Sequence, residues 1–499
     1  MVQIENLIEK TPSFKQITAD LQPKNHQLIT GISGSARTEL LSALSKEGQR
    51  PILVVTDTIS HMQELASDLE NLLPANRVYQ FPVEEVLAAE VATSSPNYRL
   101  QRVLALNALI NNEPAVVVAS AAGLRRNIIS PEYFAQSSLK IKTGGEVDPA
   151  KIRQQLSAMG YQYQKMVLRP GDFAIRGSII DIYALNTDNP VRIDLFDTEV
   201  DSLRYFDAST QRSIDNVEEV QILPATDFII PSPEFSRVAK ALDAEYKKVV
   251  KELSADDADI KQQVANRFEP LLNALKNQHL PNELLEFSNL VYPAKHSLFD
   301  YLPDDGTIYF DDLTRIKQFA KQMTQEDVGW FKDKVAHHQL TDVPDLSNDV
   351  SAIIKKDPHP QIYGALFKKG LGNIKLSQIT DLKSRTMQRF FGQMPLLKAE
   401  LQRWIDQGQT VVLMANSPER RKQIAQTLAD FDITATETEL TNIKPNVVQI
   451  VAANLNNGFE MPLAGLVVIT ESEMFKQVKK VHHRPQKLAN AERLKNYTD

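Results

Sequence analysis

The sequence of 499 residues contains no cysteine. This absence excludes disulfide bonds, thiolate metal sites and cysteine nucleophiles, and it is compatible with a reducing cytosol. No apolar run approaches the roughly 18 residues that a membrane-spanning helix requires. No signal peptide opens the chain, so we expect a cytoplasmic protein without a membrane segment. Internal repeats and low-complexity tracts are also lacking.

The sequence has no excess of positive charge. Its 56 Lys and Arg residues are outnumbered by 63 Asp and Glu residues, which gives a net charge of −7. A protein that binds DNA mainly through phosphates is usually basic or carries a strong basic patch. One basic run begins at Lys476 and includes His482 and His483, but no further ligand follows at metal-binding spacing. We interpret this run as a solvated connector.

The composition is that of a globular protein, with 42% hydrophobic and 24% charged residues, and the length predicts several domains. In the first 137 residues strands alternate with helices, which predicts a parallel α/β domain. The expected strands are 27–30, 52–57, 78–81 and 115–120. The expected helices are 38–44, 61–73 and 98–110.

The pattern of predicted helices and strands changes near residue 138. A helix at 149–160 and strands at 173–183, 191–196 and 203–206 predict a small inserted α+β domain. Residues 233–280 are helical by pattern, a strand returns at 307–312, and 346–384 has many Lys, Asp and Gly residues. Helices at 395–407 and 418–431, with strands at 410–414, 447–451 and 465–470, predict a final α/β domain. The expected domains are 1–137, 138–225, 226–385, which completes the first, 386–476, and a charged linker, 477–499.

Residues 31–38 read GISGSART, which follows the phosphate-binding pattern G-x-x-x-x-G-K-[ST] only in part. Gly31 and Thr38 are in place, whereas Ala36 replaces the second glycine and Arg37 the lysine. A working loop points backbone N–H groups and a helix N-terminus at phosphate oxygens. A Cβ at Ala36 hinders that approach, and the longer, forked arginine is no equivalent of lysine. We interpret the loop as a decayed nucleotide site without ATP; a coincidental Gly/Ser turn and a functional ATP site are the alternatives.

The strand predicted at 307–310 ends in two acidic residues, Asp311 and Asp312. In a nucleotide site such a strand delivers an Asp to Mg²⁺, and an adjacent Glu positions the attacking water. Asp312 stands at the Glu position and is one methylene shorter. An acidic strand end without chemistry is the alternative. The candidate degenerate site thus comprises Gly31, Gly34, Ala36, Arg37, Thr38, Asp311 and Asp312.

The inserted domain offers a different kind of candidate. In the strand 191–196, side chains alternate between faces, so Arg192 and Phe196 share the face opposite to the one that can reach a core. Arg and aromatic residues together are typical of interface hot spots. Arg176 lies on the neighbouring predicted strand, where Gly177 keeps the surface open. The alternative is a Phe covered by another part of the chain.

At these residues the chain resembles the N-terminal half of bacterial transcription-repair coupling factors (Mfd), which is itself similar to the repair helicase UvrB. The most specific stretches are 171–183 (GDFAIRGSIIDIY) and 191–204 (VRIDLFDTEVDSLR). They share the module R-G-x-x-x-[DE]…R-[IVL]-[DE]-x-F with both families. The segments 389–392 (RFFG) and 486–493 (QKLANAER) resemble the coupling factors in particular.

The resemblance implies a non-catalytic chain that recruits UvrA in transcription-coupled nucleotide excision repair. Arg176, Arg192 and Phe196 match the UvrA-contacting positions, on a degenerate helicase-like scaffold. The ATP-dependent translocase, with the contacts to RNA polymerase and DNA, would lie in a C-terminal half beyond residue 499, so we expect a fragment. Residues 82–97 lack the aromatic residues of the UvrB hairpin, which predicts no DNA unwinding. An ATP-dependent DNA motor with a functional site is the alternative.

Overall fold

The computed structural model describes residues 4–475 except 94, 255–256 and 369–370. The predicted linker 477–499, with His482 and His483, and Lys476 lie outside the described residues. Contacts divide the chain into two compact units, one made of residues up to Pro131 and from Tyr292 onward, the other of Glu132–Val291.

The first unit contains a seven-stranded sheet in which every pairing is parallel. Its order is β15 (Gln378–Asp381), β1 (His26–Thr30), β14 (Gln361–Gly364), β13 (Thr307–Asp311), β2 (Ile52–Thr56), β4 (Val116–Ser120) and β3 (Val78–Phe81). Strands β2 and β4 are buried along their whole length, as apolar parallel strands covered on both faces are. The parallel α/β domain predicted from the sequence is therefore confirmed.

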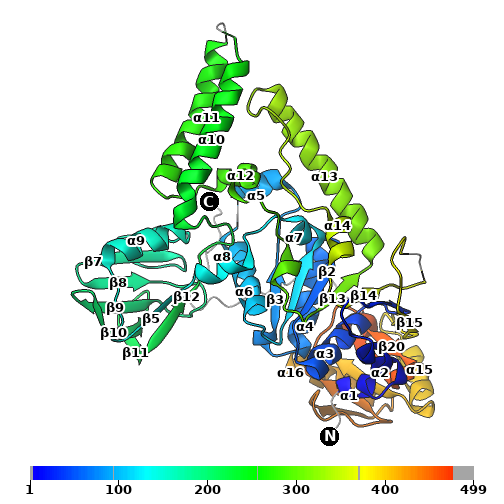
Figure 1. The fold of residues 1–499 in the computed structure, drawn as a ribbon. Helices are drawn as coiled ribbons and strands as arrows, with labels where there is room; N and C mark the ends of the chain where they lie inside the picture. Colours follow the sequence, from blue (N-terminus) through cyan, green and yellow to red (C-terminus); the bar gives the residue numbers. More distant parts are fainter. Residues whose placement is uncertain (1–3, 94, 255–256, 369–370, 476–499) are drawn as a thin grey trace, which may run out of the picture. The chain divides into compact units, whose positions relative to one another are not determined.

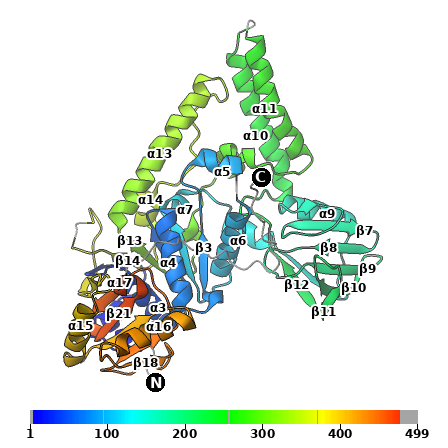
Figure 2. The same ribbon diagram turned by 180° about the vertical axis from the view of Figure 1, so that it is seen from behind.

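Helices accompany this sheet, and the long α13 (Leu313–Ala336) extends beyond it (Figure 1). The others are α1 (Ile4–Glu9), α2 (Pro12–Ala19), α3 (Ala36–Gly48), α4 (Ile59–Leu72), α5 (Leu87–Thr93), α6 (Pro96–Ile110), α7 (Ala121–Arg125) and α14 (Val350–Lys356). Helix α4 packs against β3 and β4 (Figure 2) through Met62, Leu65 and Leu69. The 24-residue helix α13 is not among the elements predicted from the sequence.

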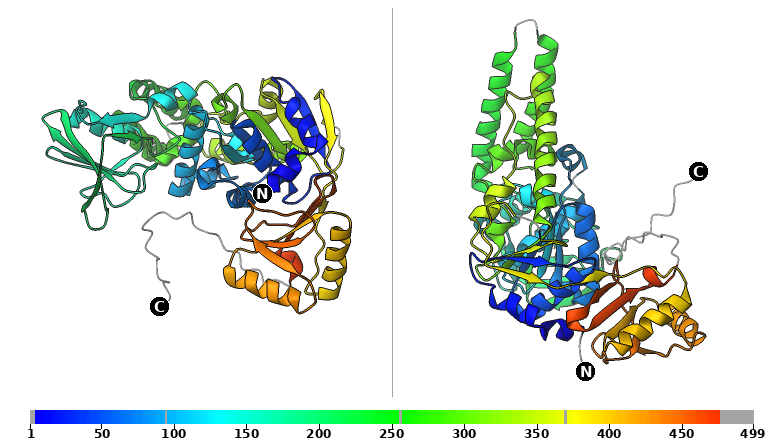
Figure 3. Two further views of the ribbon diagram at one scale, coloured as in Figure 1. Left: turned by 90° about the horizontal axis from the view of Figure 1, so that it is seen from below. Right: turned by 90° about the vertical axis from the view of Figure 1, so that its right-hand side faces the viewer.

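The same unit carries a second sheet of six strands (Figure 3). Its order is β16 (Arg385–Thr386), β20 (Phe459–Met461), β21 (Leu466–Thr470), β17 (Thr410–Met414), β19 (Val448–Val451) and β18 (Ala435–Thr438). Helices α15 (Met394–Asp406), α16 (Pro418–Ala429) and α17 (Glu471–Met474) accompany it. The pairs β16–β20 and β20–β21 are antiparallel and the others parallel, so this final α/β domain has a mixed sheet.

The second unit is built on another six-stranded sheet. Its order is β11 (Ser213–Val217), β10 (Glu199–Phe206), β9 (Val191–Phe196), β8 (Ile179–Ile182), β7 (Asp172–Arg176) and β6 (Gln162–Tyr163). All pairs except β6–β7 are antiparallel. Ile152 and Leu156 of α9 (Pro149–Ala158) complete its core with Phe173, Ile180 and Ile193.

The prediction of a single strand at 173–183 is wrong. Gly177, at φ 62°, turns the chain between β7 and β8, which pair in antiparallel fashion. A two-stranded sheet of β5 (Leu139–Lys142) and β12 (Glu219–Ile222) joins the same core. The unit also contains α8 (Pro131–Gln136), α12 (Ser288–Val291) and the antiparallel pair α10 (Phe235–Glu252) and α11 (Ala258–Lys276) (Figure 1). None of the helices in the described part of the chain is long and apolar enough to cross a membrane.

Candidate functional site

The altered phosphate loop lies between β1 and α3, at the carboxyl edge of the seven-stranded sheet. This is the edge where open α/β sheets bind ligands. Gly31 and Gly34 both adopt positive φ, 63° and 54°. A Cβ on Gly31 would lie 2.9 Å from the backbone nitrogen of Lys383, so glycine is required there for space as well as for its positive φ. Both glycines of the loop thus adopt the left-handed backbone conformation that favours glycine.

Several backbone groups of this loop form hydrogen bonds with other parts of the protein. The Gly31 amide donates to the carbonyl of Leu366 at 3.1 Å, and the Gly31 carbonyl accepts from the Ser384 amide at 2.7 Å. The Ser33 amide donates to Ser384 Oγ at 3.1 Å. In a working loop, backbone N–H groups face phosphate oxygens. Here at least one such N–H group donates to an oxygen atom of the protein instead.

The two substituted positions are both built into the fold. Ala36 is the first residue of α3 and is fully buried in the core, so its Cβ contributes packing. Arg37 Nη1 forms an ion pair with Asp311 Oδ2 at 2.5 Å. Thr38 is also fully buried, and its hydroxyl has no hydrogen-bond partner among the described residues. The arginine therefore occupies the carboxylate that would serve Mg²⁺ in a working site.

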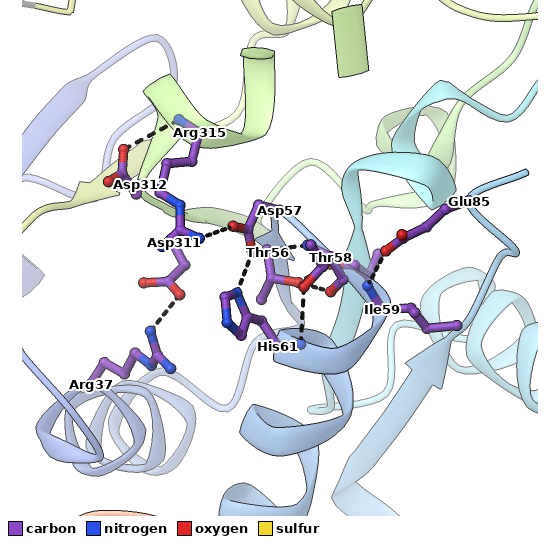
Figure 4. Close-up of polar contacts among 11 residues, drawn as sticks. Arg37, Thr56, Asp57, Thr58, Ile59, His61, Glu85, Asp311, Asp312 and Arg315 are labelled. Carbon is purple, nitrogen blue, oxygen red and sulfur yellow. Dashed lines mark hydrogen bonds and ion pairs between the residues drawn. The ribbon is translucent and has the colours of Figure 1, made fainter. Parts of the chain in front are cut away.

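A second group of charges lies at the same sheet edge (Figure 4). Asp57, which follows β2, accepts from the Thr58 amide at 2.8 Å and contacts His61 Nδ1 at 2.5 Å. Arg315 Nη2 lies 2.8 Å from the other oxygen of Asp57. Asp312 adopts a left-handed conformation and caps α13 by accepting from the Arg315 amide. The acidic strand end is thus used for ion pairing and helix capping.

A loop of the final α/β domain lies against the phosphate loop. Ser35 Oγ donates to Asp68 Oδ2 at 2.6 Å and accepts from the Asn457 amide at 3.2 Å. The other oxygen of Asp68 accepts from the backbone and side-chain amides of Asn456, at 2.8 and 2.9 Å. Burial raises the pKa of Asp68 to about 6, although the hydrogen bonds from Ser35 and Asn456 oppose the shift. These four residues join the two sheets of the first unit.

The strand face of the second unit has a graded exposure. The Phe196 side chain, at the end of β9, is 77% exposed. Arg176, at the end of β7, is 46% exposed, whereas Arg192 of β9 is only 14% exposed. We predicted that the two arginines lie on neighbouring strands. This is wrong, because β8 runs between β7 and β9. Asp181 of β8 contacts both arginines.

The chain is similar to known proteins along its whole length. Residues 139–228 match the family described as the UvrB interaction domain, and residues 406–474 match the family described as the MFD D3 domain. A transcription-repair-coupling factor of Bacillus subtilis is 35% identical over 506 aligned residues, which cover 100% of this chain and 42% of the relative. One of Staphylococcus haemolyticus is 29% identical over 498 residues, with 99% and 42% covered.

The chain is homologous to the N-terminal part of transcription-repair-coupling factors. It spans about two fifths of the length of the curated coupling factors that it matches. The match at residues 139–228 lies on the inserted domain that we expected at 138–225, and the second lies within the final α/β domain. The resemblance to a coupling factor with a UvrB-like module is therefore confirmed.

Sequence reasoning about this coupling-factor homologue missed two carboxylates. Asp181 lies inside the motif of 171–183, but its link to both arginines depends on the turn at Gly177. Asp68 lies in the middle of α4, where one Asp among buried apolar residues gives no sign of a distant loop. The spacing of five residues between Arg176 and Asp181, with Gly177 between them, is the one signal that could have indicated the first contact.

The arrangement offers little catalytic chemistry. Among the described residues of this coupling-factor homologue, no group of three or more His, Asp and Glu side chains could hold a metal ion. The acids at the sheet edge are engaged by Arg37, Arg315 and His61. The exposed strand face instead combines an aromatic side chain with a partly exposed arginine, which suits binding of another protein.

Proposed function

We propose that this chain is a non-catalytic, UvrB-like recruitment region that binds UvrA in transcription-coupled nucleotide excision repair. The inserted domain supplies the binding face through Phe196, Arg176 and Arg192. The observation that carries this proposal is the exposure of Phe196, because a large aromatic side chain that is 77% exposed, on the same strand as Arg192, fits a hot spot awaiting a partner.

We also propose that the nucleotide site of this chain has decayed. The ion pair between Arg37 and Asp311 neutralises the charges that a nucleotide and its Mg²⁺ would use. Ser35 is likewise engaged by Asp68 and Asn457. The loop thus serves the packing of the first unit, and no ATP is required.

The segment that would form the UvrB hairpin supports the absence of DNA unwinding. It contains the short helix α5, whose Glu90 is buried. Glu90 lies 3.1 Å from Arg102 Nη2 and 3.0 Å from Arg126 Nη1. A segment held by a buried ion-pair cluster and devoid of stacking residues is unsuited to separating DNA strands. We place any contacts with DNA and RNA polymerase outside the proposed UvrA-binding face and expect them in other parts of the coupling factors.

A pull-down of purified UvrA by the chain tests the binding proposal. We expect Phe196→Ala to lose most of the captured UvrA. Ile214→Ala is the matched control, because Ile214 is 47% exposed on β11 of the same sheet and should leave capture unchanged. Equal capture by all three proteins, each folded by circular dichroism, would refute the role of this face.

Calorimetric titration with Mg-ATP tests the alternative, an ATP-dependent motor. A preserved phosphate cradle should bind Mg-ATP with a dissociation constant below about 100 µM. We expect no heat of binding in that range. Two results together would favour the motor. The original chain would bind Mg-ATP with a measurable affinity, and the changes Arg37→Lys and Ala36→Gly would make that binding tighter.

A further inference from the structure

The two arginines of the proposed binding face share a single buried carboxylate. Asp181 is 1% exposed, and its side chain lies on the same face of the sheet as Arg192, its cross-strand partner. Arg192 donates from Nε to Asp181 Oδ1 at 2.7 Å and from Nη2 to Oδ2 at 2.9 Å. Arg176 donates from Nη2 to the same Oδ2 at 2.5 Å. One acid thus holds arginines from the strands on either side of it.

Arg192 is fixed from a second direction. Its guanidinium carbon lies 4.3 Å from the centre of the Phe206 ring, and Nη2 also donates to Gln211 Oε1 at 3.1 Å. Phe206 is itself fully buried in a small apolar cluster with Val167, Ala174, Tyr183 and Ala208. A guanidinium stacked on an aromatic ring and paired at its edge has little freedom left. Arg192 is therefore more a support than an exposed contact.

Arg176 has the opposite character. It is 46% exposed and pairs with Asp181 through one nitrogen only, as far as the described residues show. The guanidinium has five N–H donors, so most of them remain available at the surface. The cluster of two arginines and one aspartate keeps a net positive charge of one, which favours an acidic group on the partner.

We propose that Asp181 is a positioning residue for partner binding: it holds Arg192 against Phe206 and presents Arg176 to an acidic group of UvrA. This inference rests on the proposed function. An arginine that is already ordered loses less conformational entropy on binding than a free one. Phe196 lies apart from this cluster, at the β9–β10 turn that Asp197 makes at φ 57°, and should act independently of Asp181.

Thermodynamic coupling distinguishes positioning from a general effect on the fold. We expect Asp181→Asn, which keeps the shape and removes the charge, to weaken UvrA binding by about tenfold. In a chain that already carries Arg176→Ala and Arg192→Ala, the same change should cost less than about twofold, because the groups that it positions are gone. Combined with Phe196→Ala, the two factors should multiply. Affinities are measured by calorimetry with the whole chain and purified UvrA.

Two further measurements keep the test decisive. The Nε–H signal of Arg192 in a ¹H–¹⁵N spectrum should be protected from exchange in the original chain and lose protection in Asp181→Asn. Glu286→Gln is the control, because Glu286 pairs with Arg267 elsewhere in the same unit and should not change the affinity. If Asp181→Asn does not fold, Arg192→Lys, which keeps the charge but loses the two-pronged contact, should show the same coupling to Arg176→Ala.

The possible results separate this inference from the proposed function. Unchanged or tighter binding of Asp181→Asn, or an equal loss with and without the two arginines, would overturn the positioning role while Phe196→Ala still weakens binding. A chain that does not bind UvrA, or that binds equally well after Phe196→Ala, would refute the proposed function itself.

Discussion

At the scale of single residues, the arginine that stands at the lysine position of the phosphate-binding pattern makes a structural contact. Arg37 reaches Asp311 across the carboxyl edge of the sheet and forms a direct ion pair with it. Both side chains are largely buried, 27% and 18% exposed, and the buried Tyr309 lies nearby, where burial and the charge of Asp311 raise its pKa. The pair has become part of the packing between α3 and β13.

Removing one partner of this pair should therefore destabilise the chain. We expect Asp311→Ala to lower the free energy of unfolding by about 2 kcal/mol, because Arg37 is left without its counter-charge in a partly desolvated position. Arg37→Ala combined with Asp311→Ala should cost less than the sum of the two single changes. Urea unfolding followed by circular dichroism measures all three. Additive losses would show that the pair contributes no coupling energy.

The alternation of Arg192 and Phe196 on one face of a strand could be predicted from the sequence, because side chains in a strand alternate. The contacts that Asp181 makes could not, since they depend on a turn that the sequence pattern did not separate from the strand. Asp68 was beyond reach for another reason. Its partner Asn456 is almost 400 residues away, and only the fold brings the two together.

At the scale of elements, the contact between α4 and the 455–458 loop also holds Ser35 of the loop between β1 and α3. Asp68 of α4 binds Ser35 of the loop through one oxygen and Asn456 through the other. Glu64 and Arg37 are the charged groups that act on Asp68, in opposite directions, and Asp68 in turn helps to raise the pKa of the buried Glu39. The loop thus acts as a connector between two sheets.

This contact predicts a dependence of stability on pH. The pKa of Asp68 is about 6 in the folded chain and about 3.9 in an unfolded one, so the folded chain holds the proton more tightly. The raised pKa of Asp68 contributes up to about 3 kcal/mol to the free energy of unfolding. This contribution is fully present below about pH 4 and is lost as the pH rises through about 6. Asp68→Asn should remove this part of the slope.

Urea unfolding at several pH values between about 4 and 7 measures the slope. Glu326→Gln is the matched control, because Glu326 is exposed on α13 of the same unit and is not among the charged groups that act on Asp68. We expect the control to keep the slope of the original chain. Identical curves for the original chain and Asp68→Asn would contradict the assignment.

Most elements of the first sheet could be predicted because they are apolar runs that need no context. Strand β14 could not, although it lies between β1 and β13 and is fully buried. It has only four residues, one of them Gln361, whose side chain donates to the Ile354 carbonyl at 3.0 Å. Strand β15 is a four-residue edge strand in a stretch rich in Lys and Gly. Both are strands because of their neighbours rather than their own pattern.

At the scale of the whole molecule, the chain consists of two compact units with separate cores. The altered phosphate loop and its partners lie in one, and the proposed UvrA-binding face lies in the other. Domains with their own cores commonly unfold as separate cooperative transitions. The first unit and the proposed recruitment surface should then be independent in stability.

Differential scanning calorimetry should accordingly resolve two transitions. We expect Asp68→Asn to shift one of them and Arg192→Ala the other, because each residue lies in the contacts of a different unit. A single transition that both substitutions shift equally would show that the units unfold together.

The central claim is that this chain acts by binding UvrA through the exposed face of its inserted domain. The equilibrium affinity of purified UvrA for the chain with and without Phe196, measured by calorimetry in the absence of nucleotide, tests it most directly. We predict measurable binding by the original chain and a loss of about 30-fold or more in Phe196→Ala, as expected for a hot-spot aromatic residue. Equal affinities for the two folded proteins would contradict the account.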